Sequence, residues 1–211
     1  HIGSQITSIE PFKKVLSIIN RIINKTKINF KFIDLGGGMG ISYKKKEKQI
    51  NLKEYSKIVS KFIKNKNAQI IFEPGRFIIG NTGILITKVI YIKKSSGKNF
   101  IILDAGMNDL MRPALYNAHH EIIPLKKTKK IMKGKIEFVG PVCESSDKFS
   151  NEKIFSQLKE GDYIALANVG AYGMSLSSNY NTRPTIAEVA VSGSNCKIIK
   201  KRQSLESLIN N

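Results

Sequence analysis

The sequence predicts an α/β part followed by a mostly antiparallel β part, with a boundary near residue 82. Before that point, segments with helical periodicity alternate with short apolar strands, which is typical of a parallel α/β unit. Beyond it, apolar runs of strand length are separated by Gly, Ser and Asn turns, and helical patterns are scarce. We therefore expect one unit over residues 1–82 and a β unit over residues 83–211.

The first part predicts two helices and two strands. Apolar side chains recur at i, i+3, i+4 and i+7 over residues 8–24, which predicts a helix with Ser8 as its N-cap. A strand over 28–35 follows and runs directly into three glycines. We expect a second helix over about 51–65 and a second strand over 68–73. Because so few elements cannot cover both faces of a parallel sheet, this part is expected to complete a larger α/β structure.

The second part predicts a succession of strands. The apolar runs that predict them cover residues 83–94, 98–106, 133–140, 162–170 and 185–201. The last run is expected to be a hairpin with its turn near Gly193. One helix is expected around residues 151–159.

Composition narrows the possible classes of function. The 211-residue chain has a formal net charge of +19, from 35 Lys and Arg against 16 Asp and Glu. Because the lysines are spread along the chain rather than gathered in one patch, we do not expect nucleic-acid binding. No apolar run approaches the roughly 18 residues of a transmembrane helix, so we expect no membrane partner.

Cysteine and histidine are scarce. Cys143 and Cys196 do not make a disulfide framework, which favours a reducing cytoplasm. His119 and His120 have no carboxylate or cysteine at the spacing of a metal site. We therefore expect no metal and place both histidines in a solvated loop.

The first candidate site is the run of three glycines after the first strand, because their backbone amides could approach an anion such as a phosphate. The spacing of Gly36, Gly37 and Gly38 matches neither the dinucleotide fingerprint nor the phosphate loop of nucleoside triphosphatases. A tight turn without a ligand is the alternative. The next strand ends at Glu73, followed by Arg76. These two form either a structural ion pair or a site for a protonated ring nitrogen and an anion.

Further candidates follow strands in the second part. Arg112 and Tyr116 could bind a carboxylate together, or Arg112 could lie on the surface without a ligand. Tyr172 lies between two glycines and either packs there or contacts a ligand. Cys143 directly precedes Glu144, so its thiol could be buried packing, a metal ligand or a proton donor.

Six motifs occur in a fixed order between residue 1 and about residue 184: HIGSQ, DLGGG, EPGR, DAGMND with RPALY, GPVCESSD, and GAYGMS. Together they resemble the diaminopimelate decarboxylase family, within the alanine-racemase-like (fold-type III) pyridoxal-phosphate enzymes. The resemblance implies that residues 1–82 are the C-terminal part of a (β/α)8 (TIM-type) barrel. Residues 83–211 are then the C-terminal β domain, which carries substrate-binding and dimer-interface residues.

The resemblance also implies a role for each candidate residue. The implied cofactor is pyridoxal 5′-phosphate, bound by His1, Ser4, Gly36, Gly37, Gly38, Glu73, Gly75, Arg76 and Tyr172. The residues implied in substrate binding are Arg76, Arg112, Tyr116, Glu144 and Tyr172. Cys143 is implied as the proton donor, and His1, stacked on the cofactor ring, is counted with it among the catalytic residues.

The implied reaction is decarboxylation of meso-2,6-diaminopimelate to L-lysine and CO2, the last step of lysine biosynthesis. In the implied homodimer, Cys143 and Glu144 complete the active site of the other subunit. The Cys-Glu sequence and Arg112 favour this substrate over ornithine or arginine. A related decarboxylase of basic amino acids or carboxynorspermidine, or an inactive binding homologue, is the alternative. No lysine lies in the motif that carries the cofactor covalently, so we expect a C-terminal fragment that is inactive alone.

Overall fold

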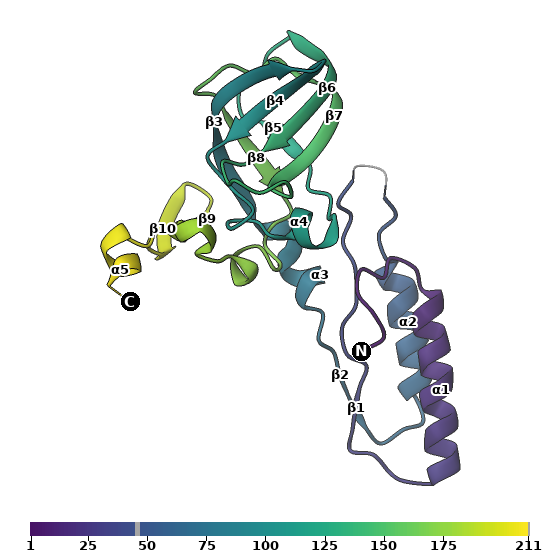
Figure 1. Ribbon diagram of the computed structural model, residues 1–211. Coiled ribbons are helices and arrows are strands. Elements are labelled where there is room, and N and C mark those ends of the chain that lie inside the picture. The colour runs from purple at the N-terminus through teal and green to yellow at the C-terminus, as the bar shows by residue number, and fades with distance from the viewer. Residues whose placement is uncertain (45–46, 211) are drawn as a thin grey trace. The chain divides into compact units, whose positions relative to one another are not determined.

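The computed structural model describes residues 1–44 and 47–210, which form two compact units, His1–Thr82 and Gly83–Asn211. Each unit is described by itself, and Figure 1 labels the elements. Within the described residues, no helix is both long enough and apolar enough to cross a membrane.

The first unit consists of two long helices beside a pair of strands (Figure 1). Its elements are α1 (Glu10–Thr26), β1 (Phe32–Asp34), α2 (Leu52–Ile63), β2 (Gln69–Ile71), α3 (Gly75–Ile79) and the 3-10 helix η1 (Gly80–Thr82). β1 and β2 pair in parallel, with Phe32 opposite Gln69. A helix thus connects two parallel strands, which agrees with the expected α/β alternation.

Helices α1 and α2 bury one side of the strand pair. Phe12 of α1 meets Tyr55 of α2 edge to face, with 5.0 Å between the ring centroids. Ile33 of β1 belongs to the same buried cluster. Its neighbour Phe32 is 57% exposed, because successive side chains of a strand point to opposite faces.

The helix ends differ in part from the sequence prediction. Helix α1 begins at Glu10 with Ile9 at the N-cap and no side-chain cap, so the assignment of Ser8 as its cap is wrong. The Ser8 side chain lies one residue too early to reach the free amides of the first turn. Asn51 caps α2, because its Oδ1 accepts a hydrogen bond of 3.1 Å from the Glu54 amide.

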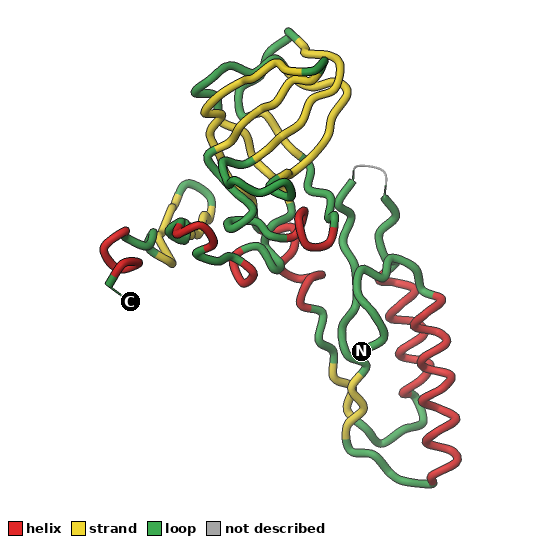
Figure 2. Tube along the Cα trace, viewed as in Figure 1, coloured by secondary structure: helices red, strands yellow, loops and turns green. Residues whose placement is uncertain are grey.

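The second unit is dominated by strands, drawn in yellow in Figure 2. Six strands form one sheet in the order β5-β8-β3-β4-β6-β7. Their bounds are β3 (Ile84–Ser95), β4 (Lys98–Leu103), β5 (Ile122–Pro124), β6 (Ile131–Val139), β7 (Lys148–Ser156) and β8 (Tyr163–Ala167). Neighbours are antiparallel except β4 and β6, which are parallel, so the sheet is mixed.

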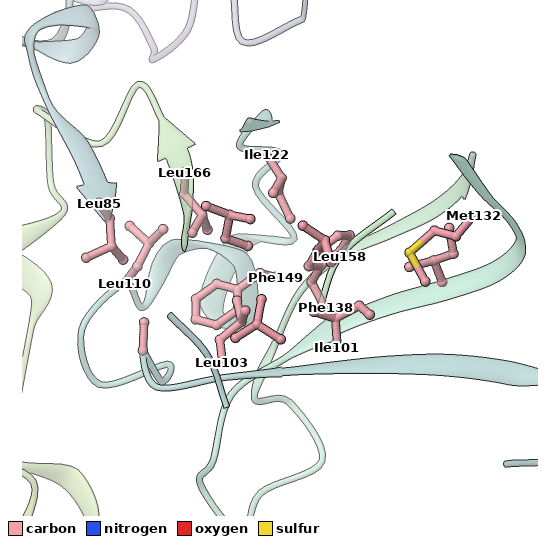
Figure 3. Close-up of a cluster of buried hydrophobic side chains, with 14 residues drawn as sticks. Leu85, Ile101, Leu103, Leu110, Ile122, Met132, Phe138, Phe149, Leu158 and Leu166 are labelled. Carbon is pink, nitrogen blue, oxygen red and sulfur yellow. The ribbon is translucent and has the colours of Figure 1, made fainter. Parts of the chain in front are cut away.

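Strand β3 pairs with two partners in turn, and the strands of the sheet share one buried core. Its first half pairs with β8 and its second half with β4. Side chains from most of the strands fill the interior (Figure 3), among them Leu103, Phe138 and Leu166, each fully buried. This core fixes the strand ends from which the candidate site residues extend.

The remaining elements are short. They are α4 (Arg112–Tyr116), the 3-10 helices η2 (Met174–Leu176) and η3 (Tyr180–Thr182), strands β9 (Glu188–Ser192) and β10 (Asn195–Lys200), and α5 (Leu205–Ile209). β9 and β10 form a separate antiparallel hairpin. The predicted turn is confirmed there, since Gly193 has a left-handed φ of 59°.

The helix expected around residues 151–159 is wrong, because β7 covers most of that segment. Phe149 belongs to the buried core cluster of the second unit, and Phe155 packs against that cluster. Phe155 packs against Phe138 of β6, with 4.9 Å between the ring centroids. Pairing with β6 and burial of these rings outweigh the local helical pattern.

Candidate functional site

Three segments of the first unit meet at the glycine loop, residues 36–38. The Ile6 amide donates a 2.9 Å hydrogen bond to the Gly38 carbonyl, and the Glu73 amide donates one of 3.0 Å to the Gly36 carbonyl. A Cβ at Gly37 would lie 2.2 Å from the Glu73 carbonyl oxygen and 3.7 Å from the His1 ring. The bare backbone therefore lets the HIGSQ and EPGR motifs approach the loop.

The conformation of the loop also requires glycine. Gly36 has a φ of 66° and Gly38 a φ of 88°, both in the left-handed region. The Gly36 amide donates to Asp34 Oδ1 at 2.7 Å, whereas the amides of Gly37 and Gly38 are not among the donors of the described hydrogen bonds. Backbone amides left available in such a loop suit an anion.

Arg76 is held beside Ser4 in the same unit. Its Nη2 donates to Ser4 Oγ at 2.8 Å, and its Nη1 donates to the Tyr43 hydroxyl at 3.0 Å. The carboxylate of Glu73, which follows β2 in the same unit, is exposed. The guanidinium and the carboxylate can therefore serve different parts of a ligand.

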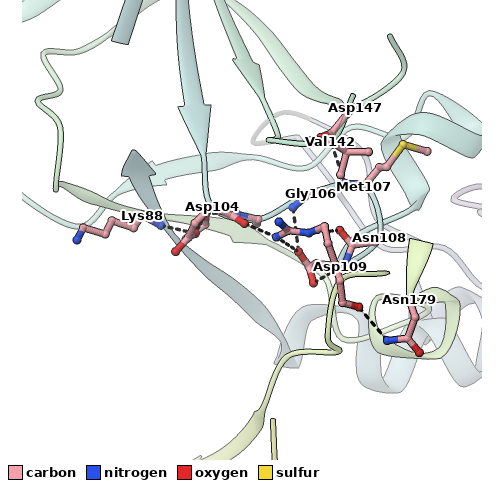
Figure 4. A network of polar contacts seen from close by, with 12 residues as sticks. Lys88, Asp104, Gly106, Met107, Asn108, Asp109, Val142, Asp147 and Asn179 are labelled. Atoms are coloured by element: carbon pink, nitrogen blue, oxygen red, sulfur yellow. Dashed lines mark hydrogen bonds and ion pairs between the residues drawn. The ribbon is translucent and has the colours of Figure 1, made fainter. Parts of the chain in front are cut away.

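In the second unit, the thiol of Cys143 and the carboxylate of Glu144 lie in the exposed loop between β6 and β7. Exposure excludes the reading of Cys143 as buried packing. Asp147 anchors this loop, because its Oδ1 accepts from the Met107 amide and its Oδ2 from the Val142 amide, each at 2.7 Å (Figure 4). Burial raises the pKa of the Asp147 carboxyl, although these two bonds oppose the effect.

Hydrogen bonds favour the ionised form of Glu144. Its Oε1 accepts hydrogen bonds of 3.3 Å from the Ser146 amide and the Ser145 hydroxyl, and its Oε2 accepts one of 3.4 Å from the Tyr180 hydroxyl. The bonds from Ser146 are the main cause that lowers the pKa of Glu144. An exposed, ionised carboxylate next to Cys143 is suited to bind a cation such as an ammonium group.

A second network fixes the loop after β4 (Figure 4). Arg183 Nε donates to Asn108 Oδ1 at 2.9 Å, and its Nη2 donates to the Asp104 carbonyl at 2.6 Å. The same Nη2 lies 3.6 Å from Asp109 Oδ2. Burial raises the pKa of Asp109, while its bond from Gly106 and the charge of Arg183 act against that shift. The loop that leads into α4 is therefore tied down at several points.

Arg112 and Tyr116 begin and end helix α4, but only one is buried. Tyr116 is 64% exposed, whereas Arg112 is 5% exposed, so the reading of Arg112 as a surface residue is wrong. Arg112 Nη1 lies 3.0 Å from His120 Nε2. The placement of His120 in a solvated loop is also wrong, because it is fully buried next to this guanidinium.

Tyr172 has a φ of 64°, which is rare for a bulky residue. Its side chain is 45% exposed, so it is not simply an aromatic packed at a strand end. Backbone conformations of this kind cluster at binding sites. The other cysteine, Cys196, is exposed on β10. No group of three or more metal-binding side chains occurs in the described part of the chain.

Sequence reasoning gave no role to several residues that build these loops. Asp147, Asn108 and Arg183 act through hydrogen bonds between segments far apart in sequence. Asp147 and Asn108 lie inside the quoted motifs, and this position was the feature of the sequence that could have indicated their role. Arg183 follows the last of these motifs by several residues, and its hydrogen-bond partners could not be predicted from the local sequence.

Comparison with known proteins defines the family. Residues 15–170 match the family model described as pyridoxal-dependent decarboxylase, C-terminal sheet domain. The chain belongs to the pyridoxal-dependent decarboxylase family. The resemblance inferred from the six motifs is thereby confirmed, and the sheet of the second unit agrees with the sheet domain of this family.

Relatives within the decarboxylase family carry a more specific name. A diaminopimelate decarboxylase from Aquifex aeolicus is 42% identical over 213 residues, covering 99% of this chain and 50% of that protein. The crystal structure of diaminopimelate decarboxylase from Helicobacter pylori complexed with L-lysine matches with a TM-score of 0.88 and 42% identity, covering 100% of this chain and 52% of that chain. The crystal structure of the enzyme from M. jannaschii in complex with L-lysine matches with a TM-score of 0.92 and 34% identity, covering 99% of this chain and 50% of that chain. The chain thus spans about half the length of the relatives it matches.

The decarboxylase family depends on pyridoxal phosphate, and the donor set of the first unit fits this cofactor. Its phosphate is an anion, for which the glycine amides, the Ser4 hydroxyl and the Arg76 guanidinium are suitable partners. Its ring nitrogen, when protonated, needs a carboxylate, and Glu73 offers an exposed one at the same loop. The chemistry of these groups matches both ends of the cofactor.

Proposed function

We propose that this chain forms the C-terminal part of a pyridoxal-phosphate-dependent decarboxylase that converts meso-2,6-diaminopimelate to L-lysine and CO2. The observation that carries the proposal is the convergence of the HIGSQ, GGG and EPGR motifs on one loop, through the bonds from Ile6 to Gly38 and from Glu73 to Gly36. The relatives named diaminopimelate decarboxylase support the choice of substrate.

The first unit is proposed to complete a (β/α)8 barrel, with the second unit as the C-terminal β domain. The parallel pairing of β1 and β2, with α1 and α2 packed on one side, supports the barrel assignment. In such barrels, ligands bind at the carboxyl ends of the strands. The glycine loop directly follows β1, and Glu73 follows β2, so both lie at such ends.

The first unit is proposed to hold the cofactor, with His1 stacked on its ring. The amides of Gly37 and Gly38, together with Ser4 and Arg76, bind the phosphate. Glu73 keeps a proton on the ring nitrogen. When bound, pyridoxal phosphate would supply an electron sink for the electron pair left on the substrate when CO2 departs. Tyr172, in its strained backbone conformation, is proposed to contact the cofactor phosphate.

The second unit is proposed to hold the substrate and to return a proton. Arg112 binds the carboxylate that L-lysine retains, with Tyr116 adding a hydrogen bond. Glu144 binds the ammonium group at the same end, which its lowered pKa supports. Cys143 Sγ donates a proton to the carbon that lost CO2.

The proposed assembly is a homodimer in which Cys143 and Glu144 complete the site of the other subunit. Exposure of the thiol on a loop anchored by Asp147 supports such a contribution, because the thiol is accessible yet held in place. The proposed location is the cytoplasm, in line with a sequence that holds only two cysteines.

The test is CO2 release from meso-diaminopimelate by a full-length protein that contains this chain, with pyridoxal phosphate added. L-ornithine, L-arginine and carboxynorspermidine serve as competing substrates. We expect turnover of diaminopimelate, loss of most of it in Glu73→Gln, and none of that loss in Glu206→Gln, an exposed carboxylate of α5. Preferred turnover of another substrate would indicate a related decarboxylase, and cofactor binding without any turnover would indicate a binding homologue.

A further inference from the structure

His120 and Arg112 form a buried polar pair at the end of the β5–β8 ladder. His120 is fully buried and Arg112 is 5% exposed. His120 Nε2 lies 3.0 Å from Arg112 Nη1, and His120 Nδ1 lies 2.8 Å from the carbonyl oxygen of Ala167, the last residue of β8. Each ring nitrogen of the histidine therefore has a partner.

The partners determine which nitrogen carries the proton. A guanidinium can only donate, so Nε2 must accept its hydrogen bond. Nδ1 then carries the proton and donates it to the Ala167 carbonyl, which can only accept. The histidine is thus neutral, and both of its bonds fix the plane of the ring.

The backbone around the pair is also fixed. The Ala167 amide donates a 2.9 Å hydrogen bond to the Glu121 carbonyl, so the residue after His120 is tied to β8. Helix α4 is followed by its C-cap Asn117, whose φ is 52° and whose amide donates to the Arg112 carbonyl. This left-handed turn reverses the chain and places His120 beside the guanidinium eight residues before it. Ile122 and Leu166, labelled in Figure 3, pack next to this point.

A neutral acceptor suits an arginine that has to bind an anion. A carboxylate in the place of His120 would also hold the guanidinium, but it would add a negative charge that repels a substrate carboxylate. The imidazole occupies one of the five N–H donors of the guanidinium and adds no charge. The arginine keeps a defined orientation without being neutralised by this partner.

We propose that His120 is a positioning residue, which holds the Arg112 guanidinium in the orientation that recognises the carboxylate retained in L-lysine. This inference rests on the proposed function, in which Arg112 binds that carboxylate. His120 itself touches neither substrate nor cofactor and acts only through Arg112. It therefore sets affinity for ligands that carry the carboxylate, and it has no effect on ligands that lack it.

The test compares two inhibitors of diaminopimelate decarboxylation by the full-length holoenzyme. L-lysine carries the carboxylate, whereas cadaverine is the same diamine without it. His120→Asn keeps a donor for Ala167, but its shorter amide cannot reach Arg112. His120→Gln places an amide oxygen near the position of Nε2 and is the rescuing variant. Ile122→Val is the control for altered packing at the same ladder.

In His120→Asn we expect the inhibition constant of L-lysine to rise about tenfold, which is the scale of one lost hydrogen bond to a charged group. Inhibition by cadaverine should stay within about twofold of the parent, and His120→Gln should restore most of the affinity for L-lysine. Ile122→Val should leave the ratio of the two constants unchanged. A merely structural role would weaken both inhibitors alike.

Equal weakening of both inhibitors in His120→Asn would overturn the proposal, as would an unchanged affinity for L-lysine. A parent enzyme that does not decarboxylate diaminopimelate would overturn the proposed function and this inference with it. The two failures are distinguished by the activity of the parent enzyme alone. If His120→Asn does not fold, the test uses His120→Gln. A ratio of the L-lysine and cadaverine inhibition constants in His120→Gln that differs from the ratio in the parent enzyme would then count against the proposal.

Discussion

At the scale of single residues, the glycine loop leaves no room for a side chain at Gly37. A Cβ at Gly37 would lie 2.2 Å from the Glu73 carbonyl oxygen, which belongs to backbone and cannot move aside cheaply. Gly75, in the same unit, has no atom within 4 Å of the corresponding position. The two glycines therefore offer a matched pair of substitutions.

We expect Gly37→Ala to lower the free energy of unfolding by about 1–3 kcal/mol, the usual cost of overpacking. Gly75→Ala should leave that free energy unchanged or slightly higher, since alanine favours the helix that begins there. Urea unfolding of both variants measures the difference, and titration with pyridoxal phosphate should show weaker binding in Gly37→Ala. Equal stability of the two variants would mean that the loop is not packed against Glu73.

Two substitutions of Asp147 test how strongly this residue holds the loop between β6 and β7, which carries Cys143. Its two carboxylate oxygens accept from the amides of Met107 and Val142. Asp147→Asn keeps one acceptor oxygen and Asp147→Ala keeps none, so we expect losses of stability of about 1 and 3 kcal/mol respectively. Thermal unfolding gives the order, and the same order should hold for activity if Cys143 is the proton donor. Activity that is unaffected in both variants would argue against Cys143 in that role.

The sequence motifs proposed the residues of the candidate site, whereas the residues that support them were not predicted. The six motifs led to the glycine loop, Glu73, Arg76, Cys143 and Tyr172, because each motif stays together along the chain. His120 was assigned to solvent wrongly, since its burial depends on β8, which lies more than 40 residues later. A contact of that kind leaves no periodic or local signal.

At the scale of elements, long periodic segments were predictable and short ones were not. Helices α1 and α2 and the long strand β3 were expected within a few residues of their observed bounds. Strand β5 and helices α4 and α5, with at most five residues each, carry too few positions for a period to show. Strand β7 was mistaken for a helix, because its partner β6, not its own sequence, decides its conformation.

Strand β6, which lies between β4 and β7, carries an ion-pair cluster whose effect depends on pH. Glu137 lies between Lys98 of β4 and Lys148 of β7, at 2.7 and 2.9 Å from their Nζ atoms. These two lysines lower the pKa of Glu137 from its ordinary value of about 4.5. The folded state therefore binds a proton less readily than the unfolded state. The ion pairs of Glu137 therefore stabilise the folded state at pH values above the ordinary pKa. This stabilisation is lost as the pH falls through the lowered pKa of the folded state.

We expect Glu137→Gln to reduce the free energy of unfolding by about 1 kcal/mol near neutral pH, the scale of exposed ion pairs. The difference from the parent should shrink as the pH falls below about 4.5, where the unfolded carboxyl is protonated. Urea unfolding at several pH values checks this, and added salt should reduce the difference as well. A difference that does not depend on pH would assign the effect to packing rather than to charge.

At the scale of the whole molecule, the two units carry complementary groups. The first holds the donors that fit the cofactor, and the second holds Arg112, Cys143 and Glu144. In the proposed homodimer, one subunit supplies the first set to a site and the other supplies Cys143. A subunit with a substitution among the cofactor-binding residues and a subunit with a substitution at Cys143 should then form one intact active site when they pair. The two-fold symmetry of the dimer predicts how many sites are intact.

We expect complementation between full-length Glu73→Gln and Cys143→Ala subunits that are unfolded together and reassembled. Random pairing of equal amounts places about half of the subunits in mixed dimers. Each mixed dimer contains one site with both an intact Glu73 and an intact Cys143, so activity should recover to about a quarter of the parent level. Each variant reassembled alone is the control and should keep only its low residual activity. If both residues of a site came from one chain, every site in the mixture would carry one defect, and no recovery would occur.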